Sequence, residues 1–208
     1  MFIYFDMGNV LLFFDHEAAC RQMAEAASTE SKRVDSGEVR KVLFDEGLEL
    51  EYEAGKISTD EFYQRFCQAI GTRPDFDRLV FAASDIFQAN LSIKPLIGAL
   101  QHARYRLGLL SNTNEMHWKF VCDGRFGFLP DAFETLALSF EIGAIKPNPS
   151  IFIRAAELAG VAPQEVFFVD DRPEHVAAAR EVGFDAVVYS DTPSLAADLR
   201  QRGIRLNY

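Results

Sequence analysis

The chain of 208 residues has the length of one domain, or of one domain with an insertion, and its 49% apolar residues can fill a complete core. Its net charge of −10 without a basic cluster argues against a nucleic-acid partner, and it shows neither a signal-peptide pattern, nor an apolar run of membrane-spanning length, nor cysteines at metal-ligand spacing. We therefore expect a cytoplasmic protein with reduced thiols, no nucleic-acid partner and no membrane partner, and the sequence does not predict its oligomeric state.

The first predicted element is a short buried strand at residues 2–5. This apolar and aromatic run is too short and too rich in β-forming residues for a helix, and it leads directly into Asp6, followed by Gly8 and Asn9. Asp6 would then stand at the end of a strand, where ligands approach open α/β sheets. Capping of the next turn is the simpler alternative role for this carboxylate.

The following stretch, from about Asp15 to Asn90, is predicted to be helical. It is rich in charged residues and helix formers, and its apolar residues recur at helical spacing. Phe62, Phe66 and Ile70, for example, fall on one face of a single helix. We expect about four helices packed on one another, with the aromatic residues in the core of the bundle.

From residue 92 onward the pattern alternates between helices and strands. Near-continuous apolar strands separated by amphipathic helices are typical of a parallel sheet covered on both faces, so we predict a doubly wound, Rossmann-like α/β fold. The expected domains are a core of residues 1–14 plus 92–208 and an inserted helical cap of residues 15–91. The predicted segments are strands at 105–110, 135–139, 166–169 and 186–189 and helices at 149–160, 173–183 and 194–202.

Polar side chains follow three of the predicted strands. Asp6, Ser111 and the pair Asp170–Asp171 each come directly after a strand. Because right-handed crossovers bring all strand ends of a parallel sheet to one edge, we expect these residues to converge. A helix cap or an ordinary turn is the default role of each one in isolation.

The chemistry of such a cluster indicates phosphoryl transfer. Three close carboxylates repel one another unless a cation is present, and Mg²⁺ is the hard cation most often found beside phosphate. Lys146, in a proline-rich turn, supplies a fixed positive charge, and the hydroxyl of Ser111 with the backbone N–H groups after it suits phosphate oxygens. An aspartate in this setting can attack phosphorus and form an aspartyl-phosphate.

Four short motifs in this order resemble those of the haloacid dehalogenase (HAD) superfamily. They are Asp-Met-Gly-Asn-Val at 6–10, Leu-Ser-Asn-Thr at 110–113, Lys-Pro at 146–147 and Val-Asp-Asp-Arg at 169–172. The insertion after the first motif resembles the helical cap of the C1 class, near glucose-1-phosphate phosphatase and the phosphatase domain of soluble epoxide hydrolase. The resemblance covers the whole chain and implies a Mg²⁺-dependent phosphatase of small phosphorylated metabolites.

The resemblance also implies a role for individual residues. It makes Asp6 the nucleophile and Lys146 the residue that holds nucleophile and phosphate together. The implied substrate-binding residues are Ser111, Asn112, Thr113 and Lys146. The implied ligands of Mg²⁺ are Asp6, the Gly8 carbonyl and Asp171, with Asp170 behind them.

One position departs from the pattern. Most phosphatases of the superfamily carry a general acid/base aspartate two positions after the nucleophile, and here that position is Gly8. Loss of such a group typically costs about 10²- to 10⁴-fold in rate. We therefore hypothesise substrates whose leaving group needs little protonation, such as sugar-1-phosphates, aryl phosphates or acyl phosphates. Asp15, His16 and His175 are candidate bases, but we expect each to be a helix-end or surface residue.

Two other functions stay open at this point. A 2-haloacid dehalogenase would use the same aspartate to attack carbon without a metal, but the Asp170–Asp171 pair argues against it, because clustered carboxylates without a cation disfavour an ionised nucleophile. A phosphate-binding protein of weak catalytic power would keep the site and lack only the acid. We rank the phosphatase first and these two after it.

Overall fold

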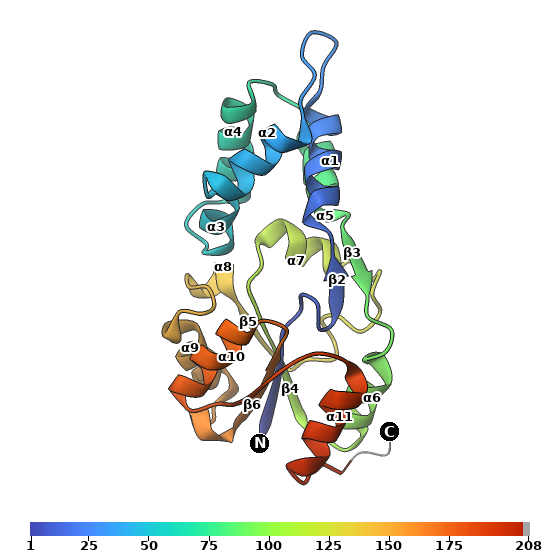
Figure 1. Cartoon of the computed structure of the whole chain (residues 1–208), viewed down its shortest axis with the longest axis vertical. Coiled ribbons are helices and arrows are strands. Elements are labelled where there is room, and N and C mark those ends of the chain that lie inside the picture. Colours follow the sequence, from blue (N-terminus) through green and yellow to red (C-terminus); the bar gives the residue numbers. More distant parts are fainter. Residues whose placement is uncertain (206–208) are drawn as a thin grey trace.

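The computed structural model describes residues 1–205, and its centre is a parallel sheet of five strands in the order β5-β4-β1-β6-β7 (Figure 1). The strands are β1 (Phe2–Phe5), β4 (Arg106–Ser111), β5 (Thr135–Leu138), β6 (Val166–Asp170) and β7 (Asp185–Val188). All four residues of β1 and all five of β6 are buried. The continuous apolar runs in the sequence therefore correspond to strands covered on both faces, which confirms the predicted fold class.

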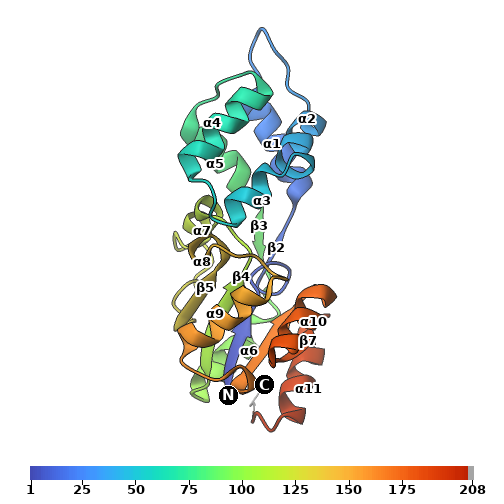
Figure 2. The same ribbon diagram turned by 90° about the vertical axis from the view of Figure 1, so that its left-hand side faces the viewer.

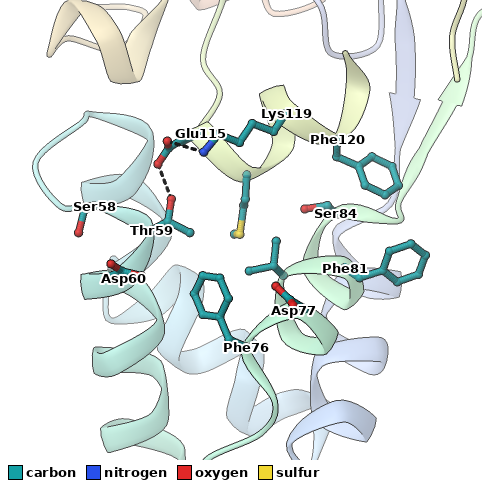
Figure 3. Close-up of a pocket in the computed structure, with 12 residues that line it drawn as sticks. Ser58, Thr59, Asp60, Phe76, Asp77, Phe81, Ser84, Glu115, Lys119 and Phe120 are labelled. Atoms are coloured by element: carbon teal, nitrogen blue, oxygen red, sulfur yellow. Dashed lines mark hydrogen bonds and ion pairs between the residues drawn. The ribbon is translucent and has the colours of Figure 1, made fainter. Parts of the chain in front are cut away.

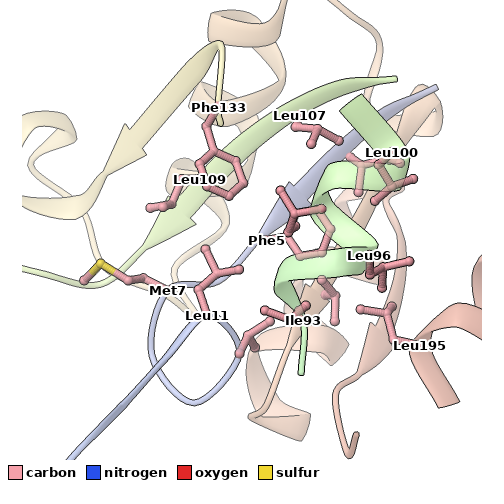
Figure 4. Close-up of a cluster of buried hydrophobic side chains, with 14 of the residues drawn as sticks. Phe5, Met7, Leu11, Ile93, Leu96, Leu100, Leu107, Leu109, Phe133 and Leu195 are labelled. Carbon is pink, nitrogen blue, oxygen red and sulfur yellow. The ribbon is translucent and has the colours of Figure 1, made fainter. Parts of the chain in front are cut away.

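Helices cover the two faces of this sheet, and the side chains of β1 alternate between them. Ile3 and Phe5 enter the apolar cluster under α6 (Lys94–His102) and α11 (Thr192–Gln201), shown in Figure 4. Phe2 and Tyr4 enter the cluster under α9 (Pro149–Ala159) and α10 (Pro173–Val182). The helices of the core are α6 (Lys94–His102), α7 (Glu115–Val121), α8 (Ser139–Ile142), α9 (Pro149–Ala159), α10 (Pro173–Val182) and α11 (Thr192–Gln201), with a 3₁₀ turn η2 (Pro163–Glu165) before β6.

A second group of helices stands beyond the edge at which the strands end (Figures 1 and 2). It has its own apolar cluster, which includes Met23, Tyr52 and Phe66. The sequence predicted about four helices here, and the structure adds a short helix and a π-helical turn. The elements are α1 (His16–Ala27), α2 (Ser36–Arg40), η1 (Lys41–Asp45), α3 (Leu48–Glu53), α4 (Thr59–Ile70) and α5 (Phe76–Ser84).

Two short antiparallel strands join these helices to the sheet. β2 (Leu12–Phe14) leads out of the core and β3 (Phe87–Ala89) leads back, with Leu12 opposite Ala89 and Phe14 opposite Phe87. Both connections therefore run side by side as one ribbon (Figure 1). Neither strand was predicted, because three residues are too few for a detectable alternation of apolar and polar positions.

Helix α3 docks directly on the core. The Ser139 hydroxyl, at the start of α8, lies 2.7 Å from the carbonyl oxygen of Glu53. The hydroxyl of Tyr52 accepts the Met116 N–H at 3.1 Å. Just past the helix, Gly55 has a positive φ of 65°, and a Cβ at this position would lie 2.1 Å from the carbonyl oxygen of Phe140. Only glycine permits the two backbones to approach this closely.

Several boundaries differ from the sequence prediction by one or two residues, and two of these differences have a visible cause. The last helix begins at Thr192 instead of Ser194, because the Asp191 side chain caps it by accepting the Ser194 N–H at 2.8 Å. Strand β5 ends at Leu138, one residue early, because Ser139 already begins α8. Among the helices of residues 1–205, none is both long and apolar enough to span a lipid bilayer.

Candidate active site

The ends of β1 and β6 bring two carboxylates onto a single lysine. The Lys146 Nζ lies 2.9 Å from Asp6 Oδ1 and 2.6 Å from Asp170 Oδ2, and it also donates to the carbonyl oxygen of Leu110 at 3.0 Å. The side chains of Lys146 and Asp170 have no solvent exposure, and that of Asp6 retains 9%. Asp6 and Asp170, two of the residues expected to converge, therefore meet on Lys146.

The three ionisable groups of this cluster, Asp6, Lys146 and Asp170, have pKa values that are shifted in different directions. Burial raises the pKa of Asp6 to about 7, assisted by the nearby Asp170 carboxylate and opposed by Lys146. Burial would also raise the pKa of Asp170, but Lys146 and His175 hold it below its usual range. Although burial opposes a charge on Lys146, its two carboxylate partners raise its pKa. Lys146 and Asp170 thus form an ion pair in which both groups are charged. The positive charge of Lys146 does not compensate the burial of Asp6, so the pKa of Asp6 stays raised.

Each Asp6 oxygen has a different environment. Oδ1 accepts hydrogen bonds from Lys146 and from the backbone N–H of Met7, the latter at 2.7 Å. The described residues supply no hydrogen bond to Oδ2. The backbone N–H of Asp6 donates to the Val169 carbonyl at 2.9 Å, which fixes the residue at the rim of the sheet. One oxygen is therefore anchored, and the other remains for a ligand.

His175 belongs to this cluster: it lies in the first turn of α10, as expected of a helix-end residue, but it is buried and not on the surface. It is 3% exposed, and its Nδ1 lies 3.1 Å from both oxygens of Asp170. The residue faces inward because α10 places it beside Val176 and Ala179, whose apolar side chains define the buried face. The helical spacing of these apolar residues was the only sign in the sequence of a buried face, and a polar histidine on that face made the sign hard to recognise.

Asp171 points to a different partner. Its Oδ2 accepts a hydrogen bond from the Asn9 side chain at 3.0 Å, and the residue is partly buried. Asn9 has a φ of 53°, in the left-handed region that asparagine tolerates better than most residues. The sequence analysis missed this role of Asn9, although an asparagine after a glycine is a sign of such a turn.

The residues after β4 have their polar groups largely engaged. Asn112 exchanges two hydrogen bonds with the backbone of Lys146, donating to its carbonyl at 3.0 Å and accepting its N–H at 2.7 Å. The Thr113 N–H donates to Ser139 Oγ at 2.9 Å, and the Ser111 hydroxyl donates to the Asn112 carbonyl at 3.2 Å. The Asn112 side chain therefore fixes the lysine loop, a function that spacing alone did not suggest.

A small cavity of about 40 Å³, called the cap–core cavity below, is lined by residues that adjoin this cluster in the chain, Met7 and Gly8, and by Asn112. Residues from the first turn, from the paired strands β2 and β3, from α3, and from α7 and the loop before it line the cavity. Among them are Met7, Gly8, Phe14, Glu53, Thr113 and His117. A larger pocket of about 560 Å³, drawn in Figure 3, lies between α4, α5 and α7 and contains none of the predicted site residues.

The residues present suit a hard divalent cation. The carboxylates of Asp6 and Asp171 are oxygen donors, and within residues 1–205 no backbone N–H is bonded to the Gly8 carbonyl. Asp6, Asp170 and His175 form a group whose ligand atoms lie within 4.8 Å of one another. The Lys146 ammonium already bridges Asp6 and Asp170. The set of Asp6, Asp171 and the Gly8 carbonyl is therefore the better match for magnesium.

The fold and this constellation together define a class of hydrolase, and the comparison of the sequence with family models agrees. The chain belongs to the haloacid dehalogenase-like hydrolases, whose model matches residues 2–183. A relative in Bacteroides thetaiotaomicron, D-ribitol-5-phosphate phosphatase, is 29% identical over 205 residues, which cover 96% of this chain and 94% of that protein. The glyceraldehyde 3-phosphate phosphatase of Methanopyrus kandleri is 52% identical over 79 residues, 38% of this chain and 33% of its own.

Solved structures give the same answer. A HAD family enzyme from Bacteroides thetaiotaomicron, crystallised with magnesium and inorganic phosphate, has a TM-score of 0.80 and 28% identity, covering 93% of this chain and 97% of its own. Family, relatives and fold therefore identify the chain as a hydrolase of the phosphatase type, which confirms the class predicted from the four motifs.

Proposed function

We propose that the protein is a Mg²⁺-dependent phosphatase that hydrolyses small phosphorylated metabolites through an aspartyl-phosphate on Asp6. The observation that carries this proposal is the ammonium of Lys146 held between Asp6 and Asp170, 2.9 and 2.6 Å away. A buried cation beside a carboxylate with one free oxygen is the arrangement that in-line attack on a phosphoryl group requires.

In this mechanism Asp6 Oδ2 attacks phosphorus while Oδ1 stays bonded to Lys146 and the Met7 N–H. The bond to the leaving oxygen breaks, and water then cleaves the aspartyl-phosphate, which releases phosphate and restores the carboxylate. The implied Mg²⁺, held by Asp6, the Gly8 carbonyl and Asp171, would offset negative charge in the transition state. Asp170 would position Lys146.

The phosphoryl group is expected to bind against the loop after β4. Ser111 ends β4, Asn112 and Thr113 follow it, and the Asn112 side chain accepts the backbone N–H of Lys146. The Thr113 hydroxyl is buried and lacks a hydrogen-bond partner within residues 1–205, so it is available to a ligand. The hydroxyl groups of this segment can donate hydrogen bonds, and the lysine supplies positive charge, so together they match a dianionic group.

We infer further that residues 15–91 form the cap and that residues 1–14 plus 92–208 form the catalytic core. Separate apolar clusters in the two parts support this division. We also propose a cytoplasmic location, on the basis of the unpaired cysteines. The names of the two relatives favour phosphate esters of small sugars or polyols as substrates.

A panel of phosphorylated metabolites, assayed with and without Mg²⁺, tests the proposal. Asp6→Asn is expected to lower turnover by more than about 10³-fold for every substrate, because an amide is not a nucleophile here. Asp45→Asn, an exposed aspartate in the cap, is the matched control and should retain full activity. Retention of activity by Asp6→Asn, or full activity in a chelator, would refute the mechanism.

A further inference from the structure

Because residue 8 is a glycine, the site lacks the general acid that would protonate the leaving oxygen of an alkyl phosphate. In this chain the space beside Gly8 is already filled, since a Cβ at residue 8 would lie 2.7 Å from Cε1 of Phe14. An aspartate at this position would displace the phenylalanine. The proton must therefore come from another wall of the cap–core cavity.

We propose that Glu53, at the end of α3, is the general acid/base of this site, supplied by the cap in place of the residue missing at position 8; this inference rests on the proposed function. Glu53 lines the cap–core cavity together with Gly8 and Thr113. Within residues 1–205 no hydrogen bond reaches its carboxyl group, which is therefore not committed to a structural role.

The backbone of Glu53 is fixed to the loop that would hold the phosphate. The Ser139 hydroxyl lies 2.7 Å from the Glu53 carbonyl oxygen and 2.9 Å from that of Thr113, and it accepts the Thr113 N–H at 2.9 Å. Ser139 is fully buried. The close contact between Gly55 and Phe140 holds the segment from the other side. Glu53 is thus located relative to the phosphate loop by the core itself.

Burial, and not the surrounding charges, brings the pKa of Glu53 near neutrality. Burial raises the pKa of its carboxyl to about 7, against the lowering effect of Lys146 and Arg172. Glu49 is the acidic neighbour on the same helix. A carboxylic acid with a pKa near neutrality can both donate and accept a proton at working pH, as acid/base catalysis requires.

The other titratable groups near the cavity are less suitable. Both ring nitrogens of His117 are engaged, Nδ1 with Asn114 at 3.0 Å and Nε2 with the Ala83 carbonyl at 3.2 Å, and burial lowers its pKa to about 4. Asp15 caps α1 through the Ala18 N–H. His16 lines the cavity as well but is solvent-exposed and stacked on Phe44.

The proton balance is simple. As Asp6 attacks and the ester P–O bond breaks, the carboxyl of Glu53 gives its proton to the leaving oxygen, and the product leaves as a neutral alcohol. The Glu53 carboxylate then takes a proton from water as the water oxygen attacks the phosphorus of the aspartyl-phosphate. Phosphate departs, Asp6 is restored and Glu53 is again protonated.

The test compares an aryl ester with an alkyl ester in Glu53→Gln. A nitrophenolate leaving group needs no proton, so a rapid-mixing experiment with 4-nitrophenyl phosphate should still show a burst of one nitrophenolate per enzyme, followed by turnover about 10²- to 10⁴-fold slower than in the wild type. An alkyl phosphate such as a polyol phosphate should show no burst and a slow first step. Glu53→Asp should recover part of the loss.

Glu51→Gln, on the same helix, is the matched control and should behave as the wild type. Loss of the burst with 4-nitrophenyl phosphate would overturn the proposal, because a merely structural role would slow the first step with the aryl ester as much as with the alkyl ester. Unchanged turnover of the alkyl phosphate by Glu53→Gln would overturn it as well. So would a retained burst with the aryl ester and a slow first step with the alkyl ester in His16→Gln instead of in Glu53→Gln. Asp6→Asn separates the two proposals: if this variant keeps its activity, the proposed function fails, whereas an inactive Asp6→Asn beside an unaffected Glu53→Gln removes only the role of Glu53.

Discussion

Glu49 offers a sharp test of how the inserted helices dock on the core. Its side chain is buried, its Oε1 accepts a hydrogen bond from Asn114 Nδ2 at 2.8 Å, and within residues 1–205 no basic group forms an ion pair with it. Burial, assisted by the nearby Glu53, raises its pKa from the ordinary 4.5 to about 8. The folded protein therefore prefers the neutral acid, and the unfolded chain prefers the carboxylate.

The sign of the resulting pH dependence follows directly. A carboxyl group whose pKa is higher in the folded state binds protons more tightly there, so its full contribution to stability is present below about pH 4.5. That contribution is lost progressively as the pH rises toward about 8. Between about pH 5 and about pH 7.5 the loss amounts to about 3 kcal/mol for a shift of this size.

Glu49→Gln removes the titration and keeps an oxygen that can accept the Asn114 hydrogen bond. We expect the free energy of unfolding of this variant, relative to the wild type, to increase by about 3 kcal/mol between about pH 5 and about pH 7.5. Urea unfolding followed by circular dichroism at several pH values measures the difference. Glu25→Gln, an exposed position on α1, should show no such trend. A difference that does not depend on pH would refute the reasoning.

Three further outcomes are expected. Lys146→Met leaves two buried carboxylates without their cation, so it should abolish turnover and lower the free energy of unfolding by about 3–5 kcal/mol; an equally stable variant in chemical denaturation would contradict this. Gly55→Ala forces a Cβ against the Phe140 carbonyl at a positive φ and should destabilise the protein by more than about 1 kcal/mol, whereas Gly124→Ala, which also has a positive φ but no atom within 4 Å, should cost less. Asp171→Asn should raise the Mg²⁺ concentration needed for half-maximal activity at least about tenfold, and an unchanged Mg²⁺ titration would remove Asp171 from the ligand set.

The fold and the central cluster were accessible from the sequence because each depends on a local pattern. A buried strand followed by a carboxylate identified Asp6 and Asp170, and the topology of a parallel sheet is enough to bring such residues together. Lys146 was found from its proline-rich turn and from the family motif. In the structure it contacts both carboxylates.

The contacts between the inserted helices and the core were not accessible in this way. Glu53 and Glu49 look like ordinary acidic residues of an amphipathic helix, and only the docking of α3 on Ser139 and Asn114 shows that they face inward. The burial of His175 was missed for a similar reason, since a polar residue on a buried helix face is recognisable only once its partner Asp170 is located. Long-range packing, which no local pattern encodes, decides all three cases.

The paired strands β2 and β3 also constrain how a substrate could enter. A single flexible link would let the inserted helices rotate in any direction, but two hydrogen-bonded links resist twisting and permit mainly a bend across their plane. A bend that lifts α3 away from α8 would break the bonds of Ser139 and Asn114 at the same moment and carry Glu53 out of reach of the phosphate. Admission of substrate and withdrawal of the proposed acid would then be one movement, so that the site would be complete only when closed to bulk water.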